Sequence, residues 1–157
     1  LRLAARYCIG QTFAATDERV LCIGGLIVRD VILRLRRFDP PLLPETVLAC
    51  GEIGEALARL WPGAQSDSTL TLATIARVFD DLAATGNVEH KSELLAELFS
   101  ACIDPREAAY LAKIIFGDLR TGVQEGVLLQ AITPALARAA LDPAELLDVD
   151  VQQLAGS

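Results

Sequence analysis

Apolar side chains in the second half of the chain recur every three or four residues, which is the spacing of one face of a helix. The first such stripe consists of Leu72, Ile75, Phe79 and Leu82. The second consists of Leu94, Leu95, Leu98, Phe99 and Cys102. Gly86 follows the first stripe and is predicted to end its helix. The pattern predicts two amphipathic helices.

The strongest helix-start signal in the chain is the sequence Asp-Pro-Arg-Glu at residues 104–107. The aspartate suits the N-cap and the proline suits the first helical position. The glutamate lies three residues after the cap, as in a capping box. We expect this helix to run to Gly117. The sequence Asp-Pro-Ala-Glu at residues 142–145 repeats the signal and predicts a further helix.

Glycine and proline divide the first half of the chain into shorter elements. The chain opens with a predicted helix that Gly10 closes. A second helix, capped by Thr16 or Asp17, is predicted to run toward Leu35 with a break at residues 24–25.

A third helix is predicted to begin at Pro44 and to reach about Leu60, with an interruption at Gly51 or Gly54. Residues 61–68 contain proline, glycine, serine and aspartate and are predicted to form a loop. The alternation of apolar and polar residues that is typical of strands is essentially absent. The chain is therefore predicted to be all-α, with roughly eight to ten short helices.

One stretch of the chain occurs twice, 107 positions apart. Residues 5–10 are echoed by residues 112–117, and residues 18–21 are echoed by residues 125–128. Each copy predicts a helix that ends at a glycine, a short polar loop, and a second helix with an acid in its first turn. We expect a compact multi-helix domain with an internal pseudo-two-fold repeat of helix-loop-helix units. Such a domain suits a target of two-fold character, for example duplex DNA.

Composition supports one helical domain. The chain has 157 residues, of which 52% are apolar and 5% aromatic. This length suits a single domain, residues 1–157, with an aliphatic, alanine-rich core. The longest apolar run, Val20 to Val28, is too short to span a bilayer, and no signal peptide is visible. The chain starts at Leu1 and contains no methionine, so we expect a fragment or an excised domain.

The formal net charge of −7 has the wrong sign for a nucleic-acid partner. Phosphate binding therefore requires that basic residues gather locally. The densest basic cluster is Arg29, Arg34, Arg36 and Arg37. On a helix these four side chains do not share one face, so a solvated surface is the default interpretation.

The four cysteines are scattered, no Cys-x-x-Cys pair exists, and the chain has one histidine. A structural zinc site is therefore not expected, and four buried thiols in a reducing cytoplasm are the simplest interpretation. Ser/His/Asp sets and metal constellations are also missing from the sequence, and no catalytic residue is expected.

Residues 117–126 hold the sharpest candidate site. Gly117 and Gly122 have the glycine spacing of a P-loop, but valine and glutamine follow where a P-loop needs lysine and serine or threonine. What remains is a loop with Arg120 at its tip, followed by helix-start N–H groups that suit a phosphate oxygen. The alternative is an ordinary turn with a solvated arginine.

A second polar turn, residues 85–91, ends at Lys91. This lysine is expected at the start of a helix, where the helix dipole disfavours a cation, and its position hints at an external anion. The alternative is a solvated surface lysine.

Five segments carry a resemblance to a known family, namely residues 13–25, 51–55, 72–83, 91–99 and 107–126. The end of the last segment, residues 117–126, Gly-Asp-Leu-Arg-Thr-Gly-Val-Gln-Glu-Gly, is the most specific. Through them, nearly all of residues 5–150 resembles the N-terminal DNA-binding domain of ATP-dependent DNA ligases of the bacterial and archaeal kind.

The resemblance implies an all-helical, pseudo-two-fold domain that grips nicked duplex DNA across the minor groove through loops between helices. It thereby helps the catalytic nucleotidyltransferase and OB domains of the same polypeptide to encircle the break. The residues implied to contact DNA are Gly117, Leu119, Arg120, Thr121 and Gly122, then Asn87 and Lys91, and in the first copy of the repeat Thr12 and Phe13.

The resemblance also implies ATP and magnesium for the full-length enzyme and no cofactor for this chain. The family's adenylated lysine lies in a Lys-x-Asp-Gly motif, whereas Lys91 precedes Ser-Glu and Lys113 precedes Ile-Ile. This chain alone is therefore not expected to ligate DNA. A helical protein–protein interaction domain is the rival interpretation. A small helical enzyme has the least support, because no convergent set of titratable residues is present.

Overall fold

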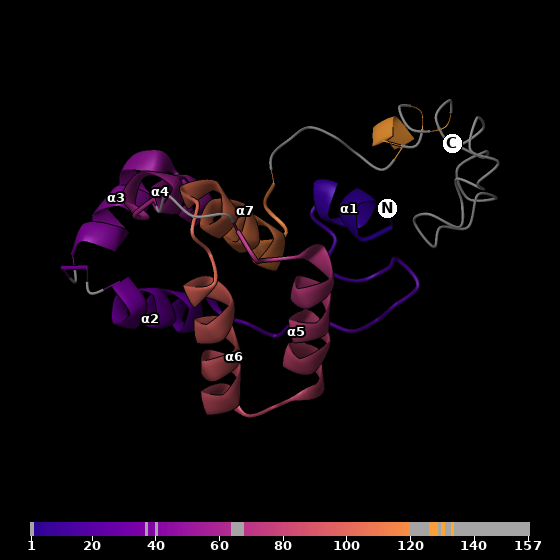
Figure 1. Ribbon diagram of the computed structural model, residues 1–157, viewed down its shortest axis with the longest axis horizontal. Helices are drawn as coiled ribbons and strands as arrows, with labels where there is room; N and C mark the ends of the chain where they lie inside the picture. The colour runs from indigo at the N-terminus through magenta and orange to yellow at the C-terminus, as the bar shows by residue number, and fades with distance from the viewer. Residues whose placement is uncertain are drawn as a thin grey trace.

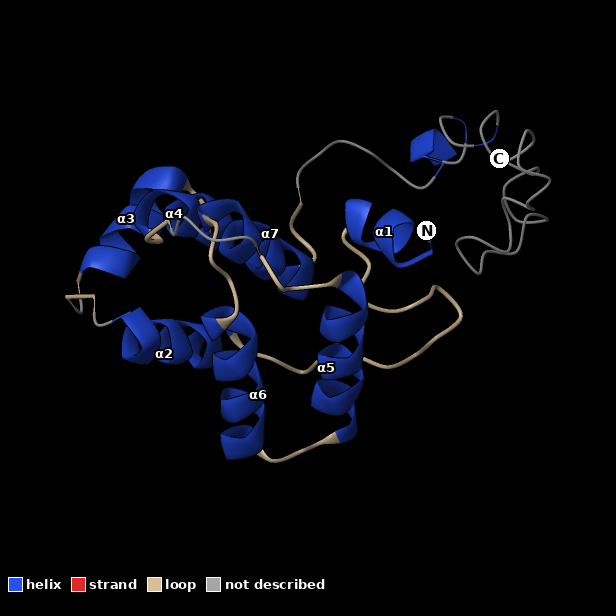
Figure 2. Ribbon diagram, viewed as in Figure 1, coloured by secondary structure: helices blue, strands red, loops and turns tan. Residues whose placement is uncertain are grey.

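The computed structural model describes residues 2–36, 38–39, 41–63, 68–119, 126–128, 130 and 133. In this part of the chain there are helices and loops and no strand, which confirms the all-α prediction (Figures 1 and 2). Residues 126–128, 130 and 133 are helical. The predicted helix at residues 142–145 lies outside the described residues. The seven helices with defined bounds are α1 (Arg2–Cys8), α2 (Gly25–Arg36), α3 (Leu42–Cys50), α4 (Ile53–Leu60), α5 (Leu72–Ala84), α6 (Val88–Ser100) and α7 (Pro105–Phe116).

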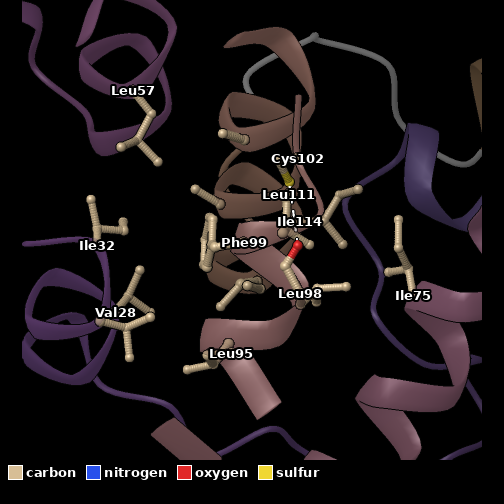
Figure 3. Close-up of a cluster of buried hydrophobic side chains, with 14 of the residues drawn as sticks. Val28, Ile32, Leu57, Ile75, Leu95, Leu98, Phe99, Cys102, Leu111 and Ile114 are labelled. Atoms are coloured by element: carbon tan, nitrogen blue, oxygen red, sulfur yellow. Dashed lines mark hydrogen bonds between the residues drawn. The ribbon is translucent and has the colours of Figure 1, made fainter. Parts of the chain in front are cut away.

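The first apolar stripe lies on α5 and the second on α6, except for Cys102, which follows α6, and both stripes face the core. Most of their members are buried, while Leu72 is exposed and Leu94 is partly buried. Around them pack α1 against α5, α2 against α6, and α4 against α7. Figure 3 shows how side chains from α2, α4, α5, α6 and α7 meet in one apolar cluster. The largest fully buried side chains are Phe79, Phe99, Ile32, Leu43, Leu57, Leu82, Leu95 and Leu111.

The start of α7 has the predicted capping box. The carboxylate of Asp104 accepts the backbone N–H of Arg106, and the carboxylate of Glu107 accepts the backbone N–H of Asp104 at 3.1 Å. Pro105 occupies the first helical position, and Gly117 ends the helix with φ 65°. Local sequence alone specifies both ends of this helix.

The prediction of a helix from Thr16 or Asp17 onward is wrong, because α2 begins only at Gly25. The acid that was expected to start the helix in the first copy of the repeat, Glu18, therefore lies in a non-helical segment. The carboxylate of Asp17 binds Arg19, two residues on, and does not cap a helix.

The third predicted helix is two helices. It begins at Leu42, two residues before the expected start, and Gly51, with φ 81°, ends α3. Gly54 lies inside α4 and does not interrupt it. A carbon atom added at Gly54 would lie 2.6 Å from Cγ and Cε of Lys113 and 3.1 Å from the carbonyl oxygen of Ala109. Glycine is therefore needed here so that α4 and α7 can approach closely.

The expectation of four buried thiols is also wrong. Cys8 and Cys22 are exposed, Cys50 is partly buried, and only Cys102 is buried. The carbonyl oxygen of Cys102 accepts Nε1 of Trp61 at 3.0 Å and Nη2 of Arg36 at 3.2 Å. The Arg36 guanidinium also lies 3.9 Å from the centre of the Trp61 ring. Arg36, the last residue of α2, therefore packs against Trp61 and bonds the chain just after α6. Arg29, in contrast, is exposed and pairs with Asp30.

An ion-pair cluster joins α4 to α7. Nζ of Lys113 lies 3.0 Å from a carboxylate oxygen of Glu52 and 2.6 Å from one of Glu55. The hydrogen bond from Lys113 lowers the pKa of the Glu55 carboxyl below its usual 4.5. The same bond raises the pKa of Lys113 above its usual 10.5. The cluster therefore stabilises the folded chain fully between these two values.

We expect the free energy of unfolding to fall below about pH 4.5 as the folded chain loses the Glu55 charge, and to fall again at high pH as Lys113 deprotonates. The variant Glu55→Gln should be less stable than the unsubstituted chain at neutral pH, and this difference should shrink as the pH is lowered through 4.5. Urea unfolding at a series of pH values measures both trends. Glu97→Gln, which removes an exposed carboxylate of α6, is the control. A Glu55→Gln difference that is independent of pH would contradict the account.

Candidate nucleic-acid interface

The two glycines of the repeated stretch end their helices in the same way. Gly10 has φ 76° and Gly117 has φ 65°. After α1, the N–H of Gly10 bonds the carbonyl of Tyr7 at 3.1 Å and the N–H of Gln11 bonds the carbonyl of Arg6 at 3.0 Å. After α7, the N–H groups of residues 117 and 118 bond the carbonyls of residues 114 and 113 at 3.2 and 2.9 Å. Both helix ends are therefore Schellman motifs.

These two helix ends lie against each other. A carbon atom added at Gly10 would lie 3.7 Å from the carbonyl group of Gly117 and 3.0 Å from Cδ1 of Leu119. The hydroxyl of Thr12 donates to the carbonyl oxygen of Ile114 at 3.4 Å. The close approach requires glycine at position 10 on two grounds, its positive φ and the lack of room for a side chain.

A groove of about 540 Å³ opens beside this contact. One wall is the C-terminal end of α7, residues 115–117, and the other is the segment that connects α1 to α2. We call residues 11–23 the connecting segment. Of the residues implied to contact DNA, Thr12, Phe13 and Gly117 line this groove, and Leu119 packs partly buried beside it. Two loops that are distant in the sequence thus form one surface.

Arg19 fixes the middle of the connecting segment. Its guanidinium donates from Nε and Nη2 to the carboxylate of Asp17, the shortest contact being 2.6 Å, and from Nη1 to Asp80 of α5 at 2.9 Å. The guanidinium also lies 4.6 Å from the centre of the Phe13 ring. The side-chain hydrogen bond from Arg19 lowers the pKa of the Asp17 carboxyl. Arg19 is a site residue that the sequence did not indicate, although the Asp-x-Arg spacing near Phe13 is a signal that could have revealed it.

Lys91 fixes the end of the connecting segment. The residue is only 5% exposed, and its Nζ donates to the carbonyl oxygen of Leu21 at 2.6 Å and to that of Cys22 at 3.4 Å. Neither a phosphate contact nor a solvated surface lysine fits this position. The lysine is a positioning residue that holds one wall of the groove, and Cys22, with φ 48°, turns its carbonyl toward it.

Asn87 is not brought to the groove. Its side chain caps α6 by accepting the N–H groups of Glu89 at 2.8 Å and His90 at 3.2 Å. In Figure 1 the turn between α5 and α6 lies at the bottom of the view, whereas α1 and α7 lie at the top. Arg120, Thr121 and Gly122 lie outside the described residues, as does the acid of the second copy, Glu125.

The described residues contain no cluster of three or more His, Cys, Asp or Glu side chains that could hold a metal ion. No helix in the same part of the chain has the length and apolar character needed to cross a membrane.

Comparison with known proteins points to one family. A family model described as DNA ligase N terminus matches residues 1–133. A probable DNA ligase of Koribacter versatilis is 34% identical over 137 residues, which are 87% of this chain and 24% of that protein. A DNA ligase of Halorubrum lacusprofundi is 30% identical over 148 residues, or 86% of this chain and 25% of that protein.

A DNA ligase of Haloarcula marismortui is 31% identical over 169 aligned positions, or 97% of this chain and 29% of that protein. The chain therefore spans about a quarter of the length of these curated relatives, from 24% to 29%.

The buried position of Lys91 predicts a loss of stability in Lys91→Met, which keeps the aliphatic stem and removes the donor. We expect the free energy of unfolding to fall by about 1–3 kcal/mol, because the carbonyl groups of Leu21 and Cys22 lose their partner. Urea unfolding measures the change, and Arg34→Met, which removes an exposed cation of α2, should change stability by less than about 0.5 kcal/mol. Equal stability of Lys91→Met and the unsubstituted chain would show that Lys91 does not hold the segment.

Proposed function

Because the chain belongs to the DNA ligase N-terminus family, we propose that it is the non-catalytic DNA-binding module of an ATP-dependent DNA ligase. In this role it grips nicked duplex DNA through phosphate contacts in the minor groove. The gripped DNA is then sealed, in repair, replication or recombination, by catalytic and OB domains of the same cytoplasmic polypeptide.

The observation that carries this proposal is the contact between the two matching helix ends. Gly10 and Gly117 end α1 and α7 with the same pair of hydrogen bonds, and the two glycines touch. The segments that follow these two glycines therefore start from one point of the molecule, which supports joint action on one ligand. Duplex DNA presents two backbones across its minor groove, so two such loops suit one strand each.

The sequence of the second loop supports phosphate over base recognition. It offers Gly117 and Gly122, which permit close approach, and an arginine at position 120, a residue type that contacts phosphate oxygens. Phosphate contacts position a protein on the duplex without reading its sequence. The module would therefore hold nicks in any sequence.

ATP and magnesium belong to the remainder of the polypeptide in this proposal. A Lys-x-Asp-Gly motif is missing from the chain, and the described residues offer no acidic cluster for a metal ion. Adenylation and phosphoryl transfer would take place on the catalytic domains, while this module supplies affinity and orientation.

A second candidate function rests on a separate apolar groove of about 500 Å³ near α3. Leu43, Val47 and Leu48 of α3 line it, together with Ile53 and Phe116, and Leu48 is 86% exposed. Such a surface suits a protein partner, and large exposed apolar patches commonly mark interaction sites. Ionic strength separates the two functions, because an apolar interface responds little to salt.

Fluorescence anisotropy on a nicked duplex at low and moderate salt tests the proposal. We expect binding that weakens steeply with salt, because the logarithm of the binding constant falls by about 0.9 for each phosphate neutralised. Arg120→Ala should weaken binding to all duplexes alike and reduce this slope by about one.

Arg59→Ala, which removes an exposed arginine from the last turn of α4, is the control and should bind as the unsubstituted chain does. Binding that is insensitive to salt, or a loss in Arg120→Ala that is confined to one sequence, would argue for the protein-partner function or for base recognition.

A further inference from the structure

The connecting segment contains a cation that the sequence repeat does not reveal. Phe13 stands 107 positions before Arg120, so the first copy of the repeat has an aromatic ring where the second has a guanidinium. The structure places the guanidinium of Arg19 on that ring, 4.6 Å from its centre. We propose that Arg19 is the phosphate-contacting residue of the first loop. This inference rests on the proposed DNA-binding function and goes beyond it by assigning the residue.

The hydrogen bonds of Arg19 leave part of its guanidinium available. Nε and Nη2 donate to Asp17, and Nη1 donates to Asp80. A guanidinium carries five N–H groups, two of them on each Nη atom. One N–H on each Nη atom therefore remains for a ligand, and the side chain is 50% exposed. These N–H groups can donate charge-assisted hydrogen bonds to phosphate oxygens.

The same contacts hold the guanidinium in place before a ligand arrives. Asp17 grips one edge of it with both carboxylate oxygens, at 2.9 and 3.0 Å from Nε, and the Phe13 ring covers one face. A flexible arginine loses side-chain entropy when it binds a phosphate, whereas a side chain that is already held loses less. Arg19 also lines the groove beside Gly117, so its guanidinium is already positioned to contact a phosphate there.

The two carboxylates that hold Arg19 also repel a phosphate group. Two carboxylates surround one guanidinium, so the local charge is negative, and Asp80 is 55% exposed. A phosphate that approaches Nη1 therefore meets the carboxylate of Asp80 and is repelled. Removal of this charge should strengthen DNA binding, provided that Arg19 is a phosphate contact.

A purely structural role for Arg19 predicts the opposite effect. If Arg19 only attaches the connecting segment to α5, then loss of either partner detaches the segment. Arg19→Gln and Asp80→Asn should then both weaken DNA binding. If Arg19 contacts phosphate, the two substitutions should change affinity in opposite directions. The sign of the Asp80→Asn effect therefore separates the two roles.

The chain contains a matched control for each substitution. Arg106 binds Asp104 through the same Asp-x-Arg arrangement, with its backbone N–H at 2.8 Å and Nε at 3.2 Å from Oδ1. It lies at the other end of α7 from Gly117, roughly 16 Å away along the helix. Asp81 neighbours Asp80 on α5, is exposed, and makes no ion pair with Arg19. Arg106→Gln thus removes one positive charge, and Asp81→Asn one negative charge, at positions that do not line the groove.

The experiment is anisotropy of the 157-residue chain on a nicked duplex over a series of salt concentrations, for the unsubstituted chain and the four variants. Arg19→Gln should weaken binding about tenfold at low salt and lower the salt slope by about 0.9, the value for one phosphate. Asp80→Asn should tighten binding severalfold, and by more than Asp81→Asn does. Arg106→Gln should match the unsubstituted chain, and urea unfolding should show that all four variants are folded.

Three results would overturn the assignment. Equal affinities of Arg19→Gln and Arg106→Gln, with normal binding by the unsubstituted chain, would refute the role of Arg19 and leave the DNA-binding function intact. Weaker DNA binding by Asp80→Asn would show that Arg19 only attaches the connecting segment to α5. Absence of salt-sensitive binding by the unsubstituted chain would overturn the proposed function and this inference together.

Discussion

The contact between Gly10 and Gly117 is the constraint on which the rest of the interface depends. Each glycine ends a helix in the left-handed conformation. The backbone N–H of the residue after each glycine donates to a carbonyl oxygen in the last turn of the same helix. Both positions favour glycine through their positive φ, and a side chain at Gly10 would in addition press on Leu119. The groove between residues 11–23 and residues 115–117 exists because these helix ends meet.

Two tertiary contacts then determine the course of the connecting segment. Arg19 attaches its middle to Asp80 of α5, and Lys91 of α6 holds the carbonyl groups of Leu21 and Cys22. Along α7, Gly54 lets α4 pack closely, and Lys113 joins the two helices through an ion-pair cluster. The helix that forms one wall of the groove is thus packed against α4, while the other wall is tied to α5 and α6.

The sequence predicted those elements whose ends are encoded locally. The Asp-Pro-Arg-Glu start of α7, the apolar stripes of α5 and α6, and the glycine ends of α1 and α7 each depend on residues a few positions apart. The connecting segment could not be predicted in this way, because Asp17 gives a cap signal that a neighbouring arginine overrides. Lys91 was misassigned for a related reason, since its partners lie 70 and 69 residues away in the sequence.

Hydrogen–deuterium exchange of the chain with and without a nicked duplex at low salt tests the central claim most directly. If the surface built around Gly10 and Gly117 is the DNA interface, the duplex should slow exchange of backbone amides in residues 11–23 and 115–119. Exchange in α3 and in the turn between α5 and α6 should stay unchanged. Slower exchange that is confined to α3, or none in residues 11–23, would contradict the account and favour a protein partner on the apolar groove.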